Sequence, residues 1–249
     1  MTSSGPDTPR VPAGCFVTTH WSVVLMAGRS DTARAQEALE KLCRTYWFPL
    51  YAYVRRRGHS VEDAQDLTQE FFARLLEHHW VLKADRSKGR FRSFLLMAMK
   101  RFLAKEWAKA KAHKRGGQLP VIPLQLETAE TRYSQKPADT RTPEQVFEKQ
   151  WAVTLLASVL QRLRGEYKHA GKGECFEALE PCLVGDRERQ PYAALGAKLG
   201  MTEGAVKMAV GRLRARYRER LKEEIGHTVA SPGEVDEELR HLFRVLARG

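Results

Sequence analysis

The chain has 249 residues, 42 of them basic and 30 acidic, and its formal net charge of +12 favours a polyanionic partner, most often nucleic acid. The apolar run at residues 151–160 is about half as long as a membrane span, and the N-terminus lacks the apolar core of a signal peptide, so we expect a cytoplasmic protein without membrane insertion. The four cysteines are scattered and form no CxxC pair, so we expect neither a metal site nor a cofactor.

Helical periodicity runs through most of the sequence, and no sustained period-2 alternation is present. We therefore expect an all-α protein in two helical modules, preceded by a disordered N-terminus at residues 1–15. The helices are predicted at residues 32–58, 61–79, 91–113, 144–165, 174–184, 191–199, 203–224 and 234–247.

The helix predicted at residues 61–79 carries a compact acidic strip. Ser60 and Asp63 have the spacing of a capping box, and Asp63, Asp66, Glu70 and Glu77 fall within one stripe at about 100° per residue. We expect this strip to lack the basic partners at i, i+4 that stabilise such a helix. Two interpretations remain open, a solvated face or a docking surface for a basic partner. A pair of catalytic carboxylates is disfavoured because no histidine or metal-ligand set accompanies the strip.

Residues 86–115 form the most basic block, with 11 basic residues against the single acidic Glu106. Cations on the outer face of such a helix can neutralise phosphates, which gives salt-dependent binding to nucleic acid. Of the aromatic residues nearby, Phe94 and Phe102 are expected in the core. Trp80, Phe91 and Trp107 stay open as platforms on which unpaired bases stack.

Residues 116–143 contain two glycines and four prolines with little periodicity, which is typical of an extended linker. Beyond it, residues 192–218 have the spacing of a helix-turn-helix. Gly200 can adopt the left-handed conformation that ends the first helix, and Thr202 can cap the second. This second helix is the one that normally enters a DNA major groove.

The last predicted helix is amphipathic, with acids in its first turn that complement the helix dipole. Two interpretations stay open for this tail, which begins at residue 226. It packs back on the second module, or it serves as a regulatory or partner-binding segment.

Three stretches together resemble the extracytoplasmic-function (ECF) sigma factors of bacterial RNA polymerase. LYAYVRRRGHSVEDAQDLTQEFFARLLE, at residues 50–77, and FRSFLLMAMKRFLAKEWAKAKAHKR, at residues 91–115, are similar to region 2 of that family. PYAALGAKLGMTEGAVKMAVGRLRARYRERL, at residues 191–221, is similar to its region-4 helix-turn-helix. The stretches outside this pattern resemble the N- and C-terminal extensions of a subgroup of larger members.

The resemblance implies a sigma factor that binds core RNA polymerase and directs promoter recognition, strand opening and transcription initiation, without catalysis of its own. It implies a region-2-like domain at residues 16–115 that binds core polymerase and the −10 element. The Pro-rich linker at 116–143 would lead to a region-4-like domain at 144–225 that binds the −35 element, and a C-terminal extension would occupy 226–249. An anti-sigma protein is a further partner class that the resemblance admits.

The resemblance also assigns binding roles to individual residues. Core polymerase would be bound by Asp63, Asp66, Gln69 and Glu70. The −10 DNA would be bound by Arg86, Lys88, Arg90, Arg92, Lys100, Arg101, Lys105 and Lys109. The −35 DNA would be bound by Thr202, Glu203, Gly204, Lys207, Met208, Gly211, Arg212 and Arg214.

The chain departs from the family pattern at Met208 and Ala209, where the family commonly has Ser-Arg, so the family's DNA preference does not carry over there. Residues 165–190 also exceed the usual length before the helix-turn-helix. The alternative is a stand-alone helix-turn-helix regulator acting as a dimer, which leaves the acidic helix and the first basic block without a role. A nucleic-acid-processing enzyme is disfavoured because the eight histidines form no ligand or general-base arrangement.

Overall fold

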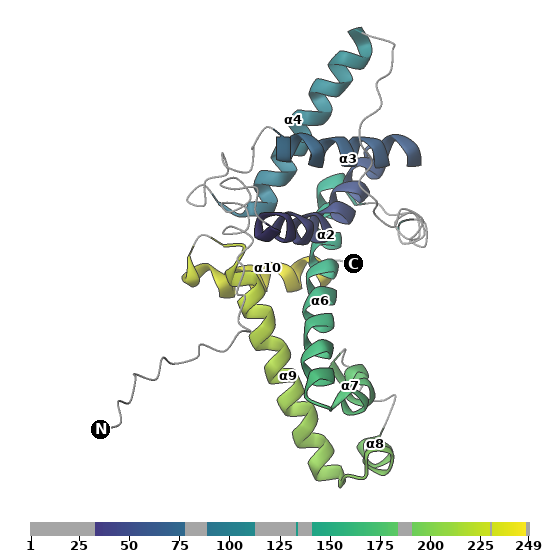
Figure 1. Ribbon diagram of the computed structural model, residues 1–249, viewed down its shortest axis with the longest axis vertical. Coiled ribbons are helices and arrows are strands. Elements are labelled where there is room, and N and C mark those ends of the chain that lie inside the picture. Colours follow the sequence, from purple (N-terminus) through teal and green to yellow (C-terminus); the bar gives the residue numbers. More distant parts are fainter. Residues whose placement is uncertain are drawn as a thin grey trace, which may run out of the picture.

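The computed structural model describes residues 33–77, 89–112, 133, 141–183, 191–229 and 231–247, and the regular elements in these ranges are all helices, which confirms the all-α prediction (Figure 1). The N-terminal segment at 1–15 and nearly all of the linker at 116–143 lie outside the described residues. The α-helices are α2 (Ala33–Arg56), α3 (Val61–Glu77), α4 (Phe91–Ala112), α6 (Pro143–His169), α7 (Gly173–Leu179), α8 (Tyr192–Leu199), α9 (Glu203–Gly226) and α10 (Val235–Ala247). Two short 3-10 helices, η3 (Glu180–Leu183) and η4 (Pro232–Glu234), follow α7 and precede α10.

Two hydrophobic cores organise these helices, and two long helices belong to both. The first core is rich in aromatic side chains from α2, α3 and α4, and it also takes in the first half of α6, the end of α9 and the apolar face of α10. The second core lies between the end of α6, α7, α8 and the first half of α9. In Figure 1, α6 and α9 run side by side from one core to the other.

The cores do not follow the boundaries expected at residues 115 and 144. Helix α6 presents Phe147, Trp151, Leu155 and Val159 to α2 and the first core, and Leu163 to the second. A helix of 27 residues is about 40 Å long, which is enough to cross from one core into the other. Its start is fixed by a capping box in which the Gln145 amide N–H donates to the Thr142 hydroxyl at 3.3 Å.

The helix-turn-helix has the local determinants expected of it. Gly200 ends α8 with φ 64°, and the Thr202 hydroxyl caps α9 by accepting a hydrogen bond from the Ala205 amide at 3.2 Å. Gly196 lies where the two helices approach most closely, because a Cβ built there would stand 2.5 Å from the carbonyl oxygen of Met201. The turn therefore depends on residues within about ten positions of each other.

Helix α10 lies across α6 and α9, the two long helices of the predicted second module (Figure 1). Its buried Leu242, together with Leu239, Val245 and Leu246, packs into the first core. The tail therefore joins elements that the sequence assigned to different modules. None of the helices described is long and apolar enough to cross a membrane.

Candidate polymerase and nucleic-acid interface

The acidic strip lies on α3, and three of its four carboxylates are exposed. These are Asp63, Asp66 and Glu77, whereas Glu70 and the neighbouring Gln69 are half-buried. The amide of Asp63 donates to the Ser60 hydroxyl at 3.0 Å, so this half of the expected capping box is present. The exposed carboxylates form a negative surface on a chain that is basic overall.

The expectation that the strip lacks i, i+4 basic partners is wrong at one position. Glu70 forms an ion pair with Arg74, one helical turn later, and Arg74 also contacts Glu106 of α4 at 2.5 Å. The Arg74 guanidinium lies over the Phe102 ring, 5.3 Å from its centroid. Glu70 is thus partly neutralised by a side chain that also ties α3 to α4, and Asp63 and Asp66 supply the exposed negative charge in the first half of α3.

Helix α4 turns part of its basic face outward. Arg101 and Lys105 are exposed, beside Met97 at 50% and Trp107 at 68% exposure. Lys100 is half-buried and contacts Glu144 at the start of α6, 2.8 Å away; this hydrogen bond holds the pKa of the Glu144 carboxyl below its usual range. Arg86, Lys88, Trp80 and the side chain of Lys109 lie outside the described part of the chain.

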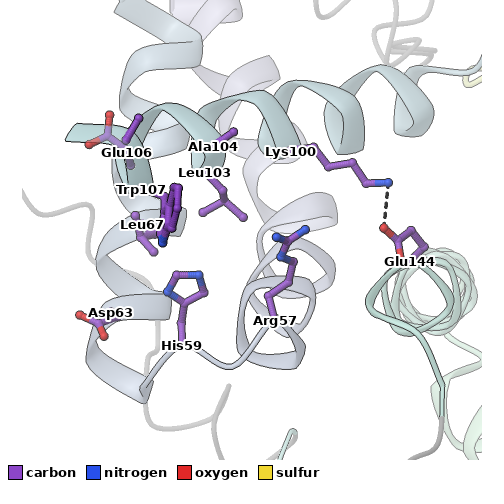
Figure 2. Close-up of a pocket in the computed structure, with 11 residues that line it drawn as sticks. Arg57, His59, Asp63, Leu67, Lys100, Leu103, Ala104, Glu106, Trp107 and Glu144 are labelled. Carbon is purple, nitrogen blue, oxygen red and sulfur yellow. Dashed lines mark ion pairs between the residues drawn. The ribbon is translucent and has the colours of Figure 1, made fainter. Parts of the chain in front are cut away.

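A groove of about 930 Å³ lies between α3 and α4 (Figure 2). Trp107, Leu67 and Leu103 form its apolar side, with Asp63 on the α3 rim, and the Lys100–Glu144 ion pair closes one end. An exposed aromatic ring among apolar neighbours and charged rims suits either a stacked base or an apolar side chain of a protein partner. The groove thus joins the acidic strip to the basic helix.

Arg92 is not available to DNA, contrary to the sequence prediction. Its side chain is 2% exposed and forms ion pairs with Glu148 of α6 and Glu238 of α10. The guanidinium also lies 4.3 Å from the centroid of the Trp151 ring. A charge this deeply buried is tolerated because carboxylates and an aromatic face replace its hydration.

Arg90 is also held by the tail rather than turned to solvent. Its Nε lies 2.8 Å from a carboxylate oxygen of Glu238, and one of its terminal nitrogens lies 3.3 Å from Glu237. Glu238 itself is completely buried, whereas the Glu237 side chain is 65% exposed. The sequence predicts the acids in the first turn of α10 as partners of the helix dipole, and nothing in it indicates that they pair with Arg90 and Arg92.

Helix α9, the second helix of the helix-turn-helix, exposes most of the residues predicted to face DNA. Glu203, Gly204, Lys207, Gly211 and Arg212 are exposed, as are Thr202 at the N-cap and Met208, the latter at 62%. Ala209, by contrast, is buried against the second core, so only the first residue of the Met-Ala pair lies on the outer face.

Arg214, which the sequence predicts as a DNA contact, has a partner within the protein. Its guanidinium donates two hydrogen bonds to the carbonyl oxygen of Cys182, at 2.5 and 3.2 Å, and this holds α9 against η3. Farther along α9, Arg216 and Arg220 lie 3.2 and 2.8 Å from Glu166 of α6. The run of arginines that extends α9 therefore serves in part to fasten α9 to its neighbours.

No group of three or more His, Cys, Asp or Glu side chains that could hold a metal ion occurs within the described ranges. What the arrangement offers is two basic faces, one acidic strip and a groove lined by an aromatic side chain. These are features of a protein that binds macromolecules.

The comparison with known families concerns the part of the protein that carries the acidic strip and the basic face of α4. Residues 42–113, which span most of α2 and all of α3 and α4, match the family described as Sigma-70 region 2. The helix-turn-helix is not covered by that match, and neither a curated protein nor a solved structure matches the chain. Sigma factors are not enzymes themselves; they bind core RNA polymerase and promoter DNA. The chain therefore carries a sigma-70 region 2 domain, and this domain implies the function of a sigma factor in transcription initiation.

Proposed function

We propose that this sigma factor is of the extracytoplasmic-function type, works in the cytoplasm on bacterial core RNA polymerase, and holds a promoter at two places. The exposed acidic strip of α3, inside the matched region of an otherwise basic protein, is the observation that carries the proposal. The helix-turn-helix downstream supplies a second grip on DNA, with the predicted modules at residues 16–115 and 144–225 as the two binding units.

The strip would dock on a basic surface of the polymerase. Asp63 and Asp66 supply exposed negative charge, and Gln69 and Glu70 lie on the same helix beside them. Complementary charge of this kind steers association and selects the partner, and it weakens as salt screens the charges. Unpaired carboxylates on a surface are the arrangement that such a partner recognises.

The −10 element would be held along the outer face of α4. Arg101 and Lys105 are exposed for phosphate contacts, and the Trp107 ring is open to a base. Lys100 joins them when its ion pair with Glu144 opens. Arg86, Lys88 and Lys109 remain part of the proposal on the sequence resemblance alone.

The −35 element would be read by the first turns of α9. Lys207, Met208, Gly211 and Arg212 lie on its exposed face, next to Thr202, Glu203 and Gly204 at its start. A helix N-terminus in a major groove places its first side chains on base edges, where each good bidentate contact contributes about 1–3 kcal/mol. Met208 offers an apolar contact in place of a hydrogen bond, which suits a thymine methyl group.

The test is binding of the full chain to core polymerase, with Asp66→Arg and a matched control. Asp66→Arg reverses a charge in the strip, and Glu219→Arg makes the same change at an exposed position of α9 outside the matched region. We expect Asp66→Arg to weaken core binding by at least about tenfold at low salt, because attraction turns into repulsion. Glu219→Arg should leave core binding within about twofold of the wild type, as expected for a charge outside the interface.

Equal core binding by the wild type and Asp66→Arg would contradict the docking role of the strip. Specific DNA binding by a chain that does not bind core polymerase at all would favour the stand-alone regulator. The same assay detects an anti-sigma protein as a competitor for the strip.

A further inference from the structure

We propose that the turn after α6 carries a further DNA contact, in which Lys172 joins Arg212 and Arg216 of α9 to bind a backbone phosphate beside the bases that the helix-turn-helix reads. These three residues are here called the flanking patch. The proposal deepens the proposed function and rests on it in one respect, namely that the first turns of α9 enter DNA. Lys172 lies in the stretch at residues 165–190 that exceeds the usual length before the helix-turn-helix, so the resemblance assigns it no role.

The three side chains of the flanking patch line one hollow of about 230 Å³ between the end of α6 and the middle of α9. The other residues that line it are Glu166, Tyr167 and Ala170. In Figure 1, the end of α6 lies with α7 and α9 at the end of the molecule that carries α8. A phosphate in this hollow would therefore meet cations from two elements, close to the helix-turn-helix.

The turn that carries Lys172 has a fixed backbone. Gly171 has φ 68°, a left-handed conformation that glycine adopts without strain. The amide of Lys172 donates to the Tyr167 carbonyl at 2.8 Å, and the amide of Gly171 donates to the Lys168 carbonyl at 3.1 Å. These hydrogen bonds close the end of α6, so Lys172 is held beside α9 by the end of a helix.

The flanking patch has more positive charge than its acidic neighbours offset. Lys172 and Arg212 are exposed, and neither has an ion-pair partner among the residues that the structure describes. Glu166 and Glu223, the acids that pair across the seam between α6 and α9, are shared by three arginines, Arg162, Arg216 and Arg220. A hollow lined mainly by one sign of charge concentrates ions of the opposite sign, so the patch suits an anion.

Local stability gives no reason for a lysine at position 172. Lys172 is the N-cap of α7 and makes no side-chain cap hydrogen bond there, and a cation is disfavoured at the positive end of a helix dipole. The last turn of α6 already holds Lys168 and His169, the type of side chain that suits a helix C-terminus. A ligand of opposite charge explains the lysine better than either helix does.

The flanking patch lies where the edge of a major groove would pass. Arg216 lies nine positions beyond Lys207 in α9, which is about 13 Å along the helix axis. Because the major groove is about 12 Å wide, a helix whose first turn reaches the bases carries such residues near the bordering phosphates. Met208, Arg212 and Arg216 follow one another at steps of four residues, so the face that reads bases leads directly into the patch.

The experiment measures binding of the full chain to a DNA duplex that this chain selects from a random-sequence pool. If the chain alone enriches no sequence, the selection and the titrations use its complex with core polymerase. Affinity is titrated at several salt concentrations on the selected duplex and on a scrambled duplex of the same composition.

Lys172→Ala is compared with Lys222→Ala, which removes the same charge about 15 Å farther along α9 than Arg212. Lys222 is exposed, and its ion pair with Asp236 is exposed on both sides, so its loss should have little effect on the fold. Lys172→Arg is the third variant and keeps the charge.

For Lys172→Ala we expect the affinity for the selected duplex to fall by at least about threefold at low salt, and the slope of log affinity against log salt to fall by about one. The ratio of the affinities for the selected and scrambled duplexes should stay within about twofold of the wild type, because a phosphate contact carries no sequence information. Lys222→Ala should keep the wild-type slope and an affinity within about twofold, and Lys172→Arg should keep the wild-type slope.

Duplexes in which a single phosphate is replaced by a neutral methylphosphonate locate the contact. One such replacement at the border of the selected site should weaken binding of the wild type and of Lys222→Ala. The same replacement should have no further effect on Lys172→Ala, because the contact is already lost.

Equal affinity and slope for the wild type and Lys172→Ala would overturn the flanking patch alone, since the proposed grip on DNA would remain. An equal loss in Lys222→Ala would show an effect of net charge and would overturn it as well. A change in the ratio between the selected and scrambled duplexes would show base readout in place of a phosphate contact. If neither the chain nor its complex with core polymerase enriches a sequence, the −35 grip of the proposed function fails, and the flanking patch fails with it.

Discussion

The two regions that we propose to face DNA are built in opposite ways. In the helix-turn-helix, the turn and its cap are set by Gly196, Gly200 and Thr202, all close together in sequence. At the start of α4, Arg92 and Arg90 find their partners 56 and 147 positions later in the chain. In a motif whose structure is set by nearby residues, the side chains that the sequence predicts to be exposed are exposed. A charged side chain can instead be buried when its ion-pair partners lie far away in the sequence.

The largest loss of stability should come from breaking the ion pair between Arg92 and Glu238, which lie far apart in the sequence. Glu238→Ala leaves Arg92 buried with Glu148 as its remaining carboxylate, which should lower the free energy of unfolding by about 3–5 kcal/mol. The double variant Arg92→Met/Glu238→Leu should recover most of that loss, because two apolar side chains fill the site without a desolvation cost. Urea denaturation of both variants measures the difference, and a loss below about 1 kcal/mol for Glu238→Ala would contradict the burial of the pair.

The next effect tests the local determinants of the helix-turn-helix. Gly196→Ala places a Cβ against the backbone carbonyl of Met201 and should cost about 1–3 kcal/mol, since backbone must move to accept it. Gly204→Ala is the matched control, because nothing lies within 4 Å of its Cβ position and alanine favours the helix. Thermal unfolding of the two variants should therefore shift in opposite directions, and equal destabilisation would argue against the close approach of α8 and α9.

A smaller effect separates DNA contacts from packing contacts along α9. Lys207→Ala and Arg212→Ala remove exposed cations, and each should lower the slope of log affinity against log salt by about one where it contacts a phosphate. Arg214→Ala should leave that slope unchanged and reduce stability instead, because its guanidinium is bonded to the Cys182 carbonyl. DNA titrations at several salt concentrations measure the slopes, and an equal drop for Arg214→Ala would contradict its assignment to packing.

The sequence predicted the helices well because their signals are local. The observed helices fall close to the predicted ranges, with Gly200 and Thr202 at the expected ends of α8 and α9. Helix α6 runs four residues beyond its predicted end, through Gly165 to His169. Periodicity and capping depend on neighbours in the chain, and those neighbours are visible in the sequence.

The pairing of charges could not be predicted in the same way. Arg92 and Arg214 have the residue type and position of DNA contacts, and only the tertiary fold brings Glu238 and the Cys182 carbonyl to them. Arg74 is the exception, because its pairing with Glu70 at i, i+4 could have been read from the sequence. The assignment of α6 to two cores could not be predicted for the same reason. Its apolar residues predict a buried face, but they do not identify which helices pack against each half of it.

Promoter-dependent transcription by core RNA polymerase, with and without the full chain, tests the central claim most directly. The chain should make core polymerase initiate at specific promoters, and Asp66→Arg should abolish most of that initiation while DNA binding by the helix-turn-helix persists. Initiation that does not depend on the chain, or that is unaffected by Asp66→Arg together with Glu70→Arg, would contradict the account.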